Sequence, residues 1–365
     1  MFKTGSPVTG KYFIDRKKDL PLFKSFIDNN QHIMIKAPRR FGKTSIVKHL
    51  LENKEYTFIY IDIRRVSNLN SLANEIIEKS YNLLGIENFI SKAKSSLFDL
   101  IKTIQKIKIE KIGEITIKYL ENQKDEIEYF LHSLDIVSQI ATKKNINIKF
   151  AFDEFQDILE ITNNDILNKI RSVIQHHENV TYIFLGSIEP IMNKIFSSKK
   201  SPFFHFAKII DLPPFDIDEV FEYANKVFNK ENINIPLLKK GLNYFKGHPD
   251  YTIQFLQKLY IYSKAYNLKN IDEKLLISYI KETIEDNQAY IDELIIKAKH
   301  KKHHLEELIN IAQNQKSSLD SKSLYNVRIS LENMGLIKKI DKGKYIINDI
   351  LLEYFLKKRN GIIPL

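Results

Sequence analysis

The chain has 365 residues with 56 Lys and Arg against 45 Asp and Glu, and it contains no cysteine and no tryptophan. Without cysteine it has neither a disulfide framework nor thiolate chemistry. No apolar stretch approaches the length needed to span a bilayer, and the first residues lack the apolar region of a signal peptide, so we expect a cytoplasmic protein. The formal net charge of +11 favours polyanionic partners, although the abundance of Lys, Asn and Ile can also reflect genome composition.

The first predicted elements enclose a loop of a type that binds phosphate. A helical stretch over 17–29 precedes an apolar strand over 32–36, and a helix with apolar residues at helical spacing begins at Ser45. Between them lies the octapeptide Ala37-Pro38-Arg39-Arg40-Phe41-Gly42-Lys43-Thr44. It follows the pattern G-x-x-x-x-G-K-[ST] except that Ala37 occupies the first position. The alternative is that Lys43 and Thr44 merely begin an ordinary helix.

This loop predicts a nucleotide site because its backbone N–H groups and the helix dipole would converge on phosphates. Gly42 would let the backbone approach, Lys43 would reach the outer phosphates, and the Thr44 hydroxyl would bind Mg²⁺. The predicted nucleotide-binding residues of this segment are Pro38, Arg39, Arg40, Phe41, Gly42, Lys43, Thr44 and Ser45.

A second site is predicted downstream in the same α/β pattern. A buried strand over 56–62 is followed by a mostly helical segment over 69–143, which we expect to be interrupted by a short strand-like stretch over 112–117. An apolar strand over 146–152 then ends in Asp153 and Glu154. Asp153 suits a Mg²⁺ ligand and Glu154 a residue that polarises water, although an Asp-Glu pair also often begins a helix.

A helix over 164–177 and a strand over 180–186 come next. The alternation of strands and helices predicts a largely parallel sheet with helices on both faces. Ser187 follows this strand, where P-loop ATPases place a polar sensor of the γ-phosphate. A helix cap is an equally good interpretation of a serine at this position.

Helical patterns dominate from about Asp216 to His304. Within them the segment 246–251 contains a Gly-His-Pro break, which is either a helix boundary or a turn that presents the ring of Pro249 to an adenine base. The basic stretch 297–304 contains three histidines with metal-ligand spacing, but its lysines favour an exposed linker or a phosphate-contacting surface.

The tail from 305 has the order of a winged helix-turn-helix: helix, helix and a two-stranded hairpin around Asp341-Lys342-Gly343. The second helix is expected to expose Lys322, Ser323, Tyr325, Asn326 and Arg328, and the wing to carry Lys338, Lys339, Lys342 and Lys344. These residue types suit double-stranded DNA, but such modules also serve as protein-docking domains.

Taken together, the order of these motifs resembles the archaeal-type ATPase family within the STAND branch of AAA+-related P-loop ATPases. The resemblance covers nearly the whole chain and rests on the following segments: 13–16 (Phe-Ile-Asp-Arg), 38–44, 152–154, Gly186-Ser187, Gly247-His248-Pro249 and the tail. It implies that Lys43 and Thr44 bind phosphate and Mg²⁺, that Asp153 binds Mg²⁺, that Glu154 activates water and that Pro249 lies at the adenine.

One departure concerns an arginine. Members of the family commonly have a Gly-Arg pair where this chain has His205 and Phe206. An arginine that stabilises phosphate charge can contribute on the order of 10³-fold in rate. The resemblance therefore implies slow turnover.

The sequence thus predicts an α/β protein with three parts: a P-loop ATPase core (1–215), a helical lid (216–304) and a winged helix domain (305–365). The expected function is a slow Mg²⁺-dependent ATPase that acts as a nucleotide-controlled switch, with Glu154, Lys43 and Ser187 in catalysis and ATP and Mg²⁺ as cofactors. The alternatives are a DNA-binding regulator and a signalling scaffold that self-assembles or docks a protein, each holding ATP without significant turnover.

Overall fold

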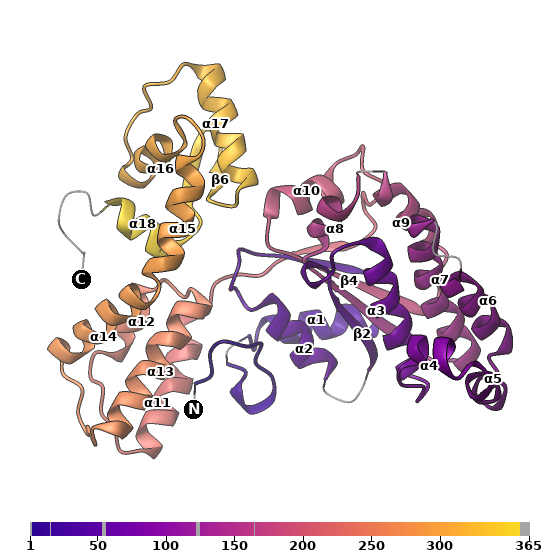
Figure 1. Ribbon diagram of the computed structural model, residues 1–365. Coiled ribbons are helices and arrows are strands. Elements are labelled where there is room, and N and C mark those ends of the chain that lie inside the picture. Colours follow the sequence, from indigo (N-terminus) through magenta and orange to yellow (C-terminus); the bar gives the residue numbers. More distant parts are fainter. Residues whose placement is uncertain (1, 15, 53–55, 122–124, 164, 358–365) are drawn as a thin grey trace.

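The computed structural model describes residues 2–14, 16–52, 56–121, 125–163 and 165–357. Asp15 of the predicted segment 13–16, Asn164 at the start of a predicted helix and the tail beyond 357 lie outside these residues. Figure 1 shows a sheet flanked by helices, a helical region beside it, and a C-terminal unit of helices and a hairpin. Among the described residues, no helix combines the length and apolar character that crossing a membrane requires.

A five-stranded parallel sheet in the order β2-β3-β4-β1-β5 organises the first part of the chain. Parallel strands need crossover connections, and here helices make them and cover both faces of the sheet. The predicted parallel sheet with helices on both faces is therefore confirmed. The strands are β1 (Ile33–Lys36), β2 (Thr57–Asp62), β3 (Ile148–Asp153), β4 (Val180–Gly186) and β5 (Lys208–Asp211).

Alternation along the strands divides the core between the two faces. Met34 points to one face and packs in a large apolar cluster with α3, α7, α9 and α10, whereas Ile33 and Ile35 point to the other and pack with α1 and α2. The helices of this part are α1 (Asp19–Asp28), α2 (Lys43–Leu51), α3 (Leu69–Asn82), α4 (Phe89–Ser95), α5 (Leu97–Lys106), α6 (Glu110–Glu121), α7 (Glu126–Lys144), α8 (Ile158–Ile161), α9 (Ile166–Ile174) and α10 (Glu189–Ser197), with short 3₁₀ turns η1 (Gly10–Tyr12), η2 (Ile63–Arg65) and η3 (Phe155–Asp157).

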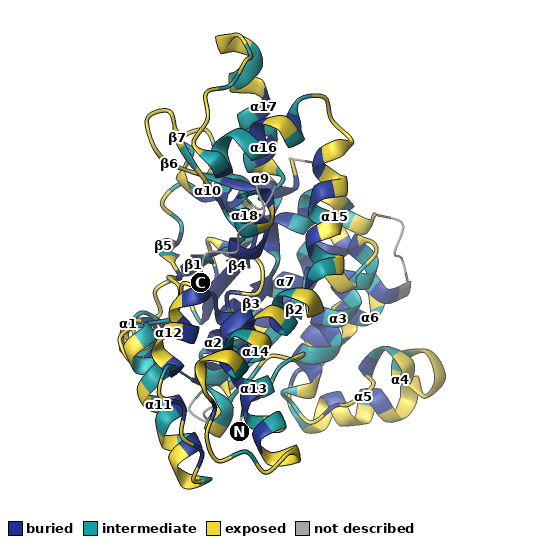
Figure 2. Cartoon of the chain, turned by 90° about the vertical axis from the view of Figure 1, so that its left-hand side faces the viewer, coloured by how far each residue is buried: buried dark blue, intermediate teal, exposed yellow. Residues whose placement is uncertain are grey.

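The expected strand-like stretch over 112–117 is wrong, because these residues lie inside helix α6. Ile112, Thr116 and Leu120 are buried at a helical spacing, which shows that the period is that of a helix. Gly113 permits close packing there: a Cβ on it would lie 2.7 Å from the Cδ1 atom of Ile104 in α5. Helices α4, α5 and α6 form a lobe at the far end of the core (Figure 1). Figure 2 shows mostly exposed residues on α4 and α5, as expected for such an outlying lobe.

Helices dominate the region between β5 and residue 304, as predicted, with one isolated β-bridge between Asn234 and Asn270. They are α11 (Ile217–Lys230), α12 (Leu238–Tyr244), α13 (Pro249–Ala265), α14 (Glu273–Asp286) and α15 (Gln288–Lys299), and we refer to them as the lid. The turn before α13 holds the lid to the end of the core. Phe215 donates its N–H to the oxygen of Gly247 at 2.8 Å, and Gly247 has φ +72°.

The C-terminal unit contains the predicted order of helix, helix and antiparallel hairpin, closed by a further helix. Its elements are α16 (His304–Gln313), α17 (Ser321–Asn333), β6 (Ile337–Asp341), β7 (Lys344–Ile347) and α18 (Ile350–Lys357). Its apolar side chains join those of the lid in one continuous buried cluster, so the two regions share a core.

The expected exposure of Arg328 on α17 is wrong. Its guanidinium pairs with Glu307 of α16 at 2.8 Å and lies 4.8 Å from the centroid of the Tyr345 ring. The Glu307 carboxylate is fully buried, so it requires a charged partner, and Arg328 turns inward to provide one. Lys322, Tyr325 and Asn326 are exposed as expected, whereas Ser323 is half-buried, contrary to the prediction.

Gly247 allows a direct test of the junction between core and lid. In Gly247→Ala, the new Cβ would lie 2.5 Å from the carbonyl oxygen of Phe215, in addition to the cost of a left-handed backbone. Gly343→Ala is the matched control, because Gly343 has φ +76° but no atom within 4 Å of the added Cβ. We expect losses of about 2–4 kcal/mol for Gly247→Ala and about 1 kcal/mol for Gly343→Ala in thermal unfolding. Equal losses would show that the Phe215 contact is unimportant.

Candidate functional site

The loop between β1 and α2 has the backbone of a phosphate cradle. Gly42 precedes the first residue of α2 with φ +83°, and Arg40 also has a left-handed φ of +64°. Ile46 donates its N–H to the oxygen of Gly42 at 2.9 Å, which begins the helix. The N–H groups of the first helical turn therefore lie at the carboxyl end of β1, where the helix dipole favours an anion.

Lys43 is the buried cation of this loop. Its side chain is 5% exposed, and its Nζ donates to the main-chain oxygens of Ala37 at 2.9 Å and Pro38 at 3.0 Å. Burial lowers the pKa of Lys43, and the carboxylates of Glu154 and Asp153 oppose this shift. The main chain of the loop thus surrounds and binds the Lys43 ammonium group.

Thr44 and Asp153 meet at the edge of the sheet. The Thr44 hydroxyl donates to Oδ2 of Asp153 at 2.6 Å, and the Tyr60 hydroxyl donates to the same oxygen. These are hard oxygen ligands, and Mg²⁺ typically takes one or two protein ligands and completes its shell with phosphates and water. The pair fits Mg²⁺. No group of three or more His, Asp or Glu side chains with metal-site geometry occurs within the described residues.

Glu154 follows Asp153 in a left-handed conformation, with φ +53°. Its Oε2 accepts from the Ser187 hydroxyl at 2.6 Å and from Nε2 of Gln156 at 2.6 Å, and its Oε1 lies 3.2 Å from the guanidinium of Arg64. Burial alone would raise the pKa of Glu154, but Lys43, the two hydrogen bonds and Arg64 outweigh it and lower the pKa. The carboxyl group is therefore ionised and oriented.

Two residues of this cluster, Tyr60 and Arg64, were not predicted from the sequence. Both come from β2 or the turn after it, and β2 pairs directly with β3, which places Asp62 opposite Asp153. The signal was available in principle, because the carboxyl ends of adjacent parallel strands meet at one edge of a sheet. It required knowing that β2 and β3 are neighbours.

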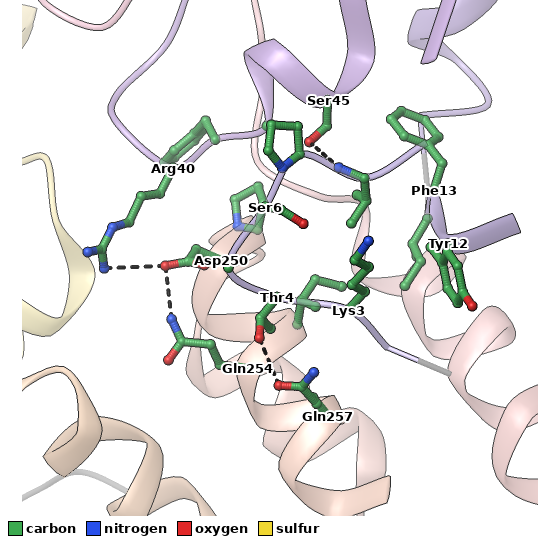
Figure 3. A pocket seen from close by; sticks show the side chains of 18 of the residues that line it. Lys3, Thr4, Ser6, Tyr12, Phe13, Arg40, Ser45, Asp250, Gln254 and Gln257 are labelled. Carbon is green, nitrogen blue, oxygen red and sulfur yellow. Dashed lines mark hydrogen bonds and ion pairs between the residues drawn. The ribbon is translucent and has the colours of Figure 1, made fainter. Parts of the chain in front are cut away.

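A cavity of about 880 Å³ opens beside the loop, between the core and the lid. Figure 3 shows that it is lined by the N-terminal segment, by the loop and by α13. Thr4 donates to Oε1 of Gln257 at 2.8 Å, so the N-terminal segment forms one wall. The predicted residues that line this cavity are Arg40, Phe41, Gly42, Lys43, Thr44, Ser45, Glu154 and Pro249.

Pro249 and Ser45 reach this cavity from the lid and from the core. Pro249 is the buried first residue of α13 and is among the residues that line the cavity. The Ser45 hydroxyl accepts from the N–H of Val8 at 3.1 Å, so it also fastens the N-terminal segment (Figure 3). A drug-sized ligand typically fills a cavity of this size.

Pro38, Arg39 and Ser187 line a second, smaller cavity, where the core meets the lid and the C-terminal unit. Arg39 is exposed and shares this cavity with Lys297 of α15. Of the two loop arginines, Arg39 is thus the one that lies at the junction of all three regions.

Phe206, which occupies the position where the resemblance implies an arginine, is remote from Glu154. The Phe206 ring packs 4.5 Å from the ring of His32, which precedes β1, and under the guanidinium of Arg171 at 4.3 Å. It therefore lies at the amino end of the strands, opposite the edge that carries Thr44. Within this chain, an arginine at position 206 would not reach the site, whereas Arg64 does.

The histidines of the 297–304 stretch do not come together as a metal site among the described residues. His304 is buried, and its Nδ1 lies 2.9 Å from the oxygen of Lys302. This places His304 at the beginning of α16, as part of the core of the C-terminal unit.

No protein-family model and no curated protein match the chain. Solved structures do. The Walker-type ATPase PABY2304 of Pyrococcus abyssi superposes with a TM-score of 0.71 at 17% identity, over 98% of this chain and 99% of that one. The ORC2 protein of Aeropyrum pernix superposes with a TM-score of 0.57 at 12% sequence identity, over 97% of this chain and 98% of that one. A variant of Thermotoga maritima RuvB superposes with a TM-score of 0.51 at 11% sequence identity, over 98% of this chain and 99% of that one. The chain therefore has the fold of P-loop ATPases.

The contact of the loop with the lid generates a pH prediction. The His248 ring lies between Phe41 and Tyr251, at centroid distances of 4.9 and 4.1 Å, and burial lowers the pKa of His248 to about 4. The unfolded chain protonates this histidine below about pH 6.5 and the folded chain only near pH 4, so stability falls as pH drops through this window. We expect His248→Phe to reduce this loss by up to about 3 kcal/mol in denaturant unfolding. The pKa values of His32 and His132 are lowered similarly, so these histidines contribute the same pH dependence to the wild type and to His248→Phe. If the two proteins lose the same stability between pH 6.5 and pH 4, His248 does not cause the loss.

Proposed function

We propose that the protein binds Mg²⁺-ATP and hydrolyses it slowly, and that the bound nucleotide controls how the lid and the C-terminal unit sit on the core. The observation that carries this proposal is the cluster at the carboxyl edge of the sheet, where Thr44 Oγ1 lies 2.6 Å from Asp153 and Glu154 lies beside Ser187. The fold supports it, because P-loop ATPases place phosphate at this edge.

Each residue would act by position and charge, as is usual for phosphoryl transfer. The backbone of 38–44 would cradle the phosphates while Lys43 donates to the outer ones. Thr44 and Asp153 would hold Mg²⁺, which supplies charge neutralisation of the phosphates when bound. Glu154 would accept a hydrogen bond from the attacking water and orient it, and Ser187 would sense the γ-phosphate. Pro249 would contact the base, and Arg39 and Arg40 would add positive potential.

Slow turnover follows from the way Glu154 is held. Its Oε2 already accepts from the Ser187 hydroxyl, the Ser187 N–H and Gln156, which leaves Oε1, the oxygen that Arg64 contacts, to orient a water. The Arg64 guanidinium, which already contacts this carboxylate, is our candidate for charge stabilisation within this chain.

The switch is supported by a contact between the core and the C-terminal unit. Lys338 of β6 pairs with Glu189 at 2.9 Å, and Glu189 comes two residues after Ser187 and is itself buried. A movement of Ser187 with the γ-phosphate would thus shift a carboxylate on which the hairpin rests. The second path runs from Phe41 through His248 to Tyr251, whose hydroxyl donates to Asp349 at 2.6 Å.

Membership of the archaeal-type ATPase family in the STAND branch is part of the proposal. Its support is the whole-chain likeness to an archaeal Walker-type ATPase and the place of Pro249 at the cavity. We also interpret the C-terminal unit as a winged helix. The exposed side chains of Lys322 and Asn326 on α17 and of Lys339, Lys342 and Lys344 on the hairpin favour a second function, a DNA-bound regulator that holds ATP.

Two substitutions test the nucleotide site. Lys43→Ala should weaken Mg²⁺-ATP binding by at least about 100-fold, because it removes the buried cation that is proposed to bind the outer phosphates. Glu154→Gln keeps the size and the hydrogen-bonding oxygen of the side chain but not its charge, so binding should persist while hydrolysis falls at least about 100-fold. Calorimetric titration gives the affinities, and phosphate release under single-turnover conditions gives the rates.

Normal hydrolysis by Glu154→Gln would remove this residue from its role. Wild-type protein that binds ATP without turnover, and whose affinity for duplex DNA falls steeply with salt, would favour the regulator instead. A change in hydrodynamic size on ATP binding would favour the scaffold.

The ion pair of the hairpin provides a test of the switch. In Lys338→Ala, we expect faster hydrogen exchange in β6 and a smaller difference in exchange between the ADP-bound and ATP-bound proteins, because the hairpin loses its contact with Glu189. Lys339→Ala is the control, since it removes a neighbouring exposed charge. If both variants show the wild-type response to nucleotide, the ion pair does not transmit it.

A further inference from the structure

The two adjacent arginines of the loop point to different places, and Arg40 reaches across to the lid. Its Nη1 lies 3.3 Å from Oδ2 of Asp250 and 3.4 Å from Oδ1 of Asn287. Its guanidinium carbon lies 4.2 Å from the centroid of the Tyr290 ring, within the range of a cation–π contact. Figure 3 shows the Arg40 side chain extended from the loop toward Asp250.

The groups that receive Arg40 are themselves connected. Gln254 donates to the same Oδ2 of Asp250 at 2.9 Å, and Asn287 donates to Oε1 of Gln254 at 2.7 Å. Asn287 also donates to the oxygen of Thr283 at 2.8 Å. Arg40 therefore binds a closed polar network that joins the first turn of α13, the last turn of α14 and the residue before α15.

The position of this network links the cavity with the C-terminal unit. Asp250 follows Pro249, which lines the cavity, so a movement of the first turn of α13 moves the cavity wall. Tyr290 lies in α15, which packs on α16 and α18. The Arg40 side chain thus contacts both the helix that lines the cavity and the helix that leads into the C-terminal unit.

The chemistry of the site requires arginine. A planar guanidinium can donate to a carboxylate and an amide while it stacks on an aromatic ring, whereas a lysine ammonium is a point charge without a face. Burial raises the pKa of Asp250 and the charge of Arg40 lowers it, so the arginine also helps to keep the carboxylate ionised. The Asp250 and Arg40 side chains are 24% and 41% exposed, so solvent screens the ion pair and the contacts act together.

We infer that Arg40 is a positioning residue that clasps the lid to the phosphate loop and thereby couples nucleotide binding to the placement of α13 and α15. The inference rests on the proposed function and names the residue that transmits occupancy of the loop. A ligand between loop and lid binds with an apparent affinity that is reduced by the fraction of molecules whose lid is misplaced. Arg40 raises the fraction that is correctly placed.

The test uses the full chain with the substitutions Arg40→Ala, Arg40→Lys and Asp250→Asn. Dissociation of Mg²⁺-ATP is followed by stopped flow with a fluorescent ATP analogue, and hydrogen exchange of α13 and α15 is measured without nucleotide. Lys240→Ala is the control, because it removes an exposed ion pair with Glu273 that lies within the lid.

We expect Arg40→Ala to weaken binding roughly 5- to 20-fold, mainly through faster dissociation, and to speed exchange at the start of α13 and α15. Arg40→Lys should lie between this variant and the wild type. Asp250→Asn keeps the charge of the loop and should shift exchange in the same direction, while Lys240→Ala should stay within about two-fold of the wild type.

Three outcomes would overturn the inference. Wild-type exchange in Arg40→Ala with weakened binding would mean that Arg40 acts on phosphate by charge alone. If Arg40→Ala has both the exchange and the affinity of the wild type, the contacts of Arg40 do not position the lid. If exchange in Arg40→Ala rises uniformly over the whole chain, the substitution destabilises the protein generally. If the wild type fails to bind nucleotide, the proposed function fails, but the exchange of α13 and α15 still reports on the clasp.

Discussion

The contact between the Thr44 hydroxyl and the Asp153 carboxylate is the constraint on which the rest of the site depends. The two residues are 109 positions apart in the chain and belong to different strand-loop units. They meet because all five strands run parallel and end at the same edge, with β4 placed between β1 and β3. Lys43, Glu154 and Ser187 are fixed relative to that contact by the same strands.

The loop between β1 and α2 lines the cavity and also contacts the lid. Lys43 turns inward to the carbonyl oxygens of its own loop, Phe41 packs on His248, and Arg40 reaches Asp250. Such a loop cannot change its backbone without affecting the helices that cover it. The proposed switch requires such a physical connection, because the lid would respond to nucleotide only through contacts with the residues proposed to hold it.

The sequence predicts the sheet, the loop and both carboxylates because these depend on local pattern: an apolar run, a Gly-Lys-Thr turn and an acidic strand end. It fails where a role depends on which elements are neighbours. Arg64 and Tyr60 were missed since nothing local places β2 beside β3, and Arg328 turns inward because Glu307 lies across from it in α16. The helix around Gly113 was mistaken for a strand because β-branched residues are frequent in that stretch, whereas burial follows a helical period. The importance of Phe206 was inferred from a resemblance, and its place at the opposite edge of the sheet could not be read from the residues around it.

The central claim is that one Mg²⁺-nucleotide complex occupies the edge of the sheet between Gly42 and Asp153. Calorimetric titration of the folded wild-type chain with ATP, in the presence of Mg²⁺ and again in excess chelator, tests it most directly. The account predicts saturable binding of about one nucleotide per chain that weakens markedly when the metal is removed. Folded protein that takes up no nucleotide, or binds it equally well without Mg²⁺, would contradict the account.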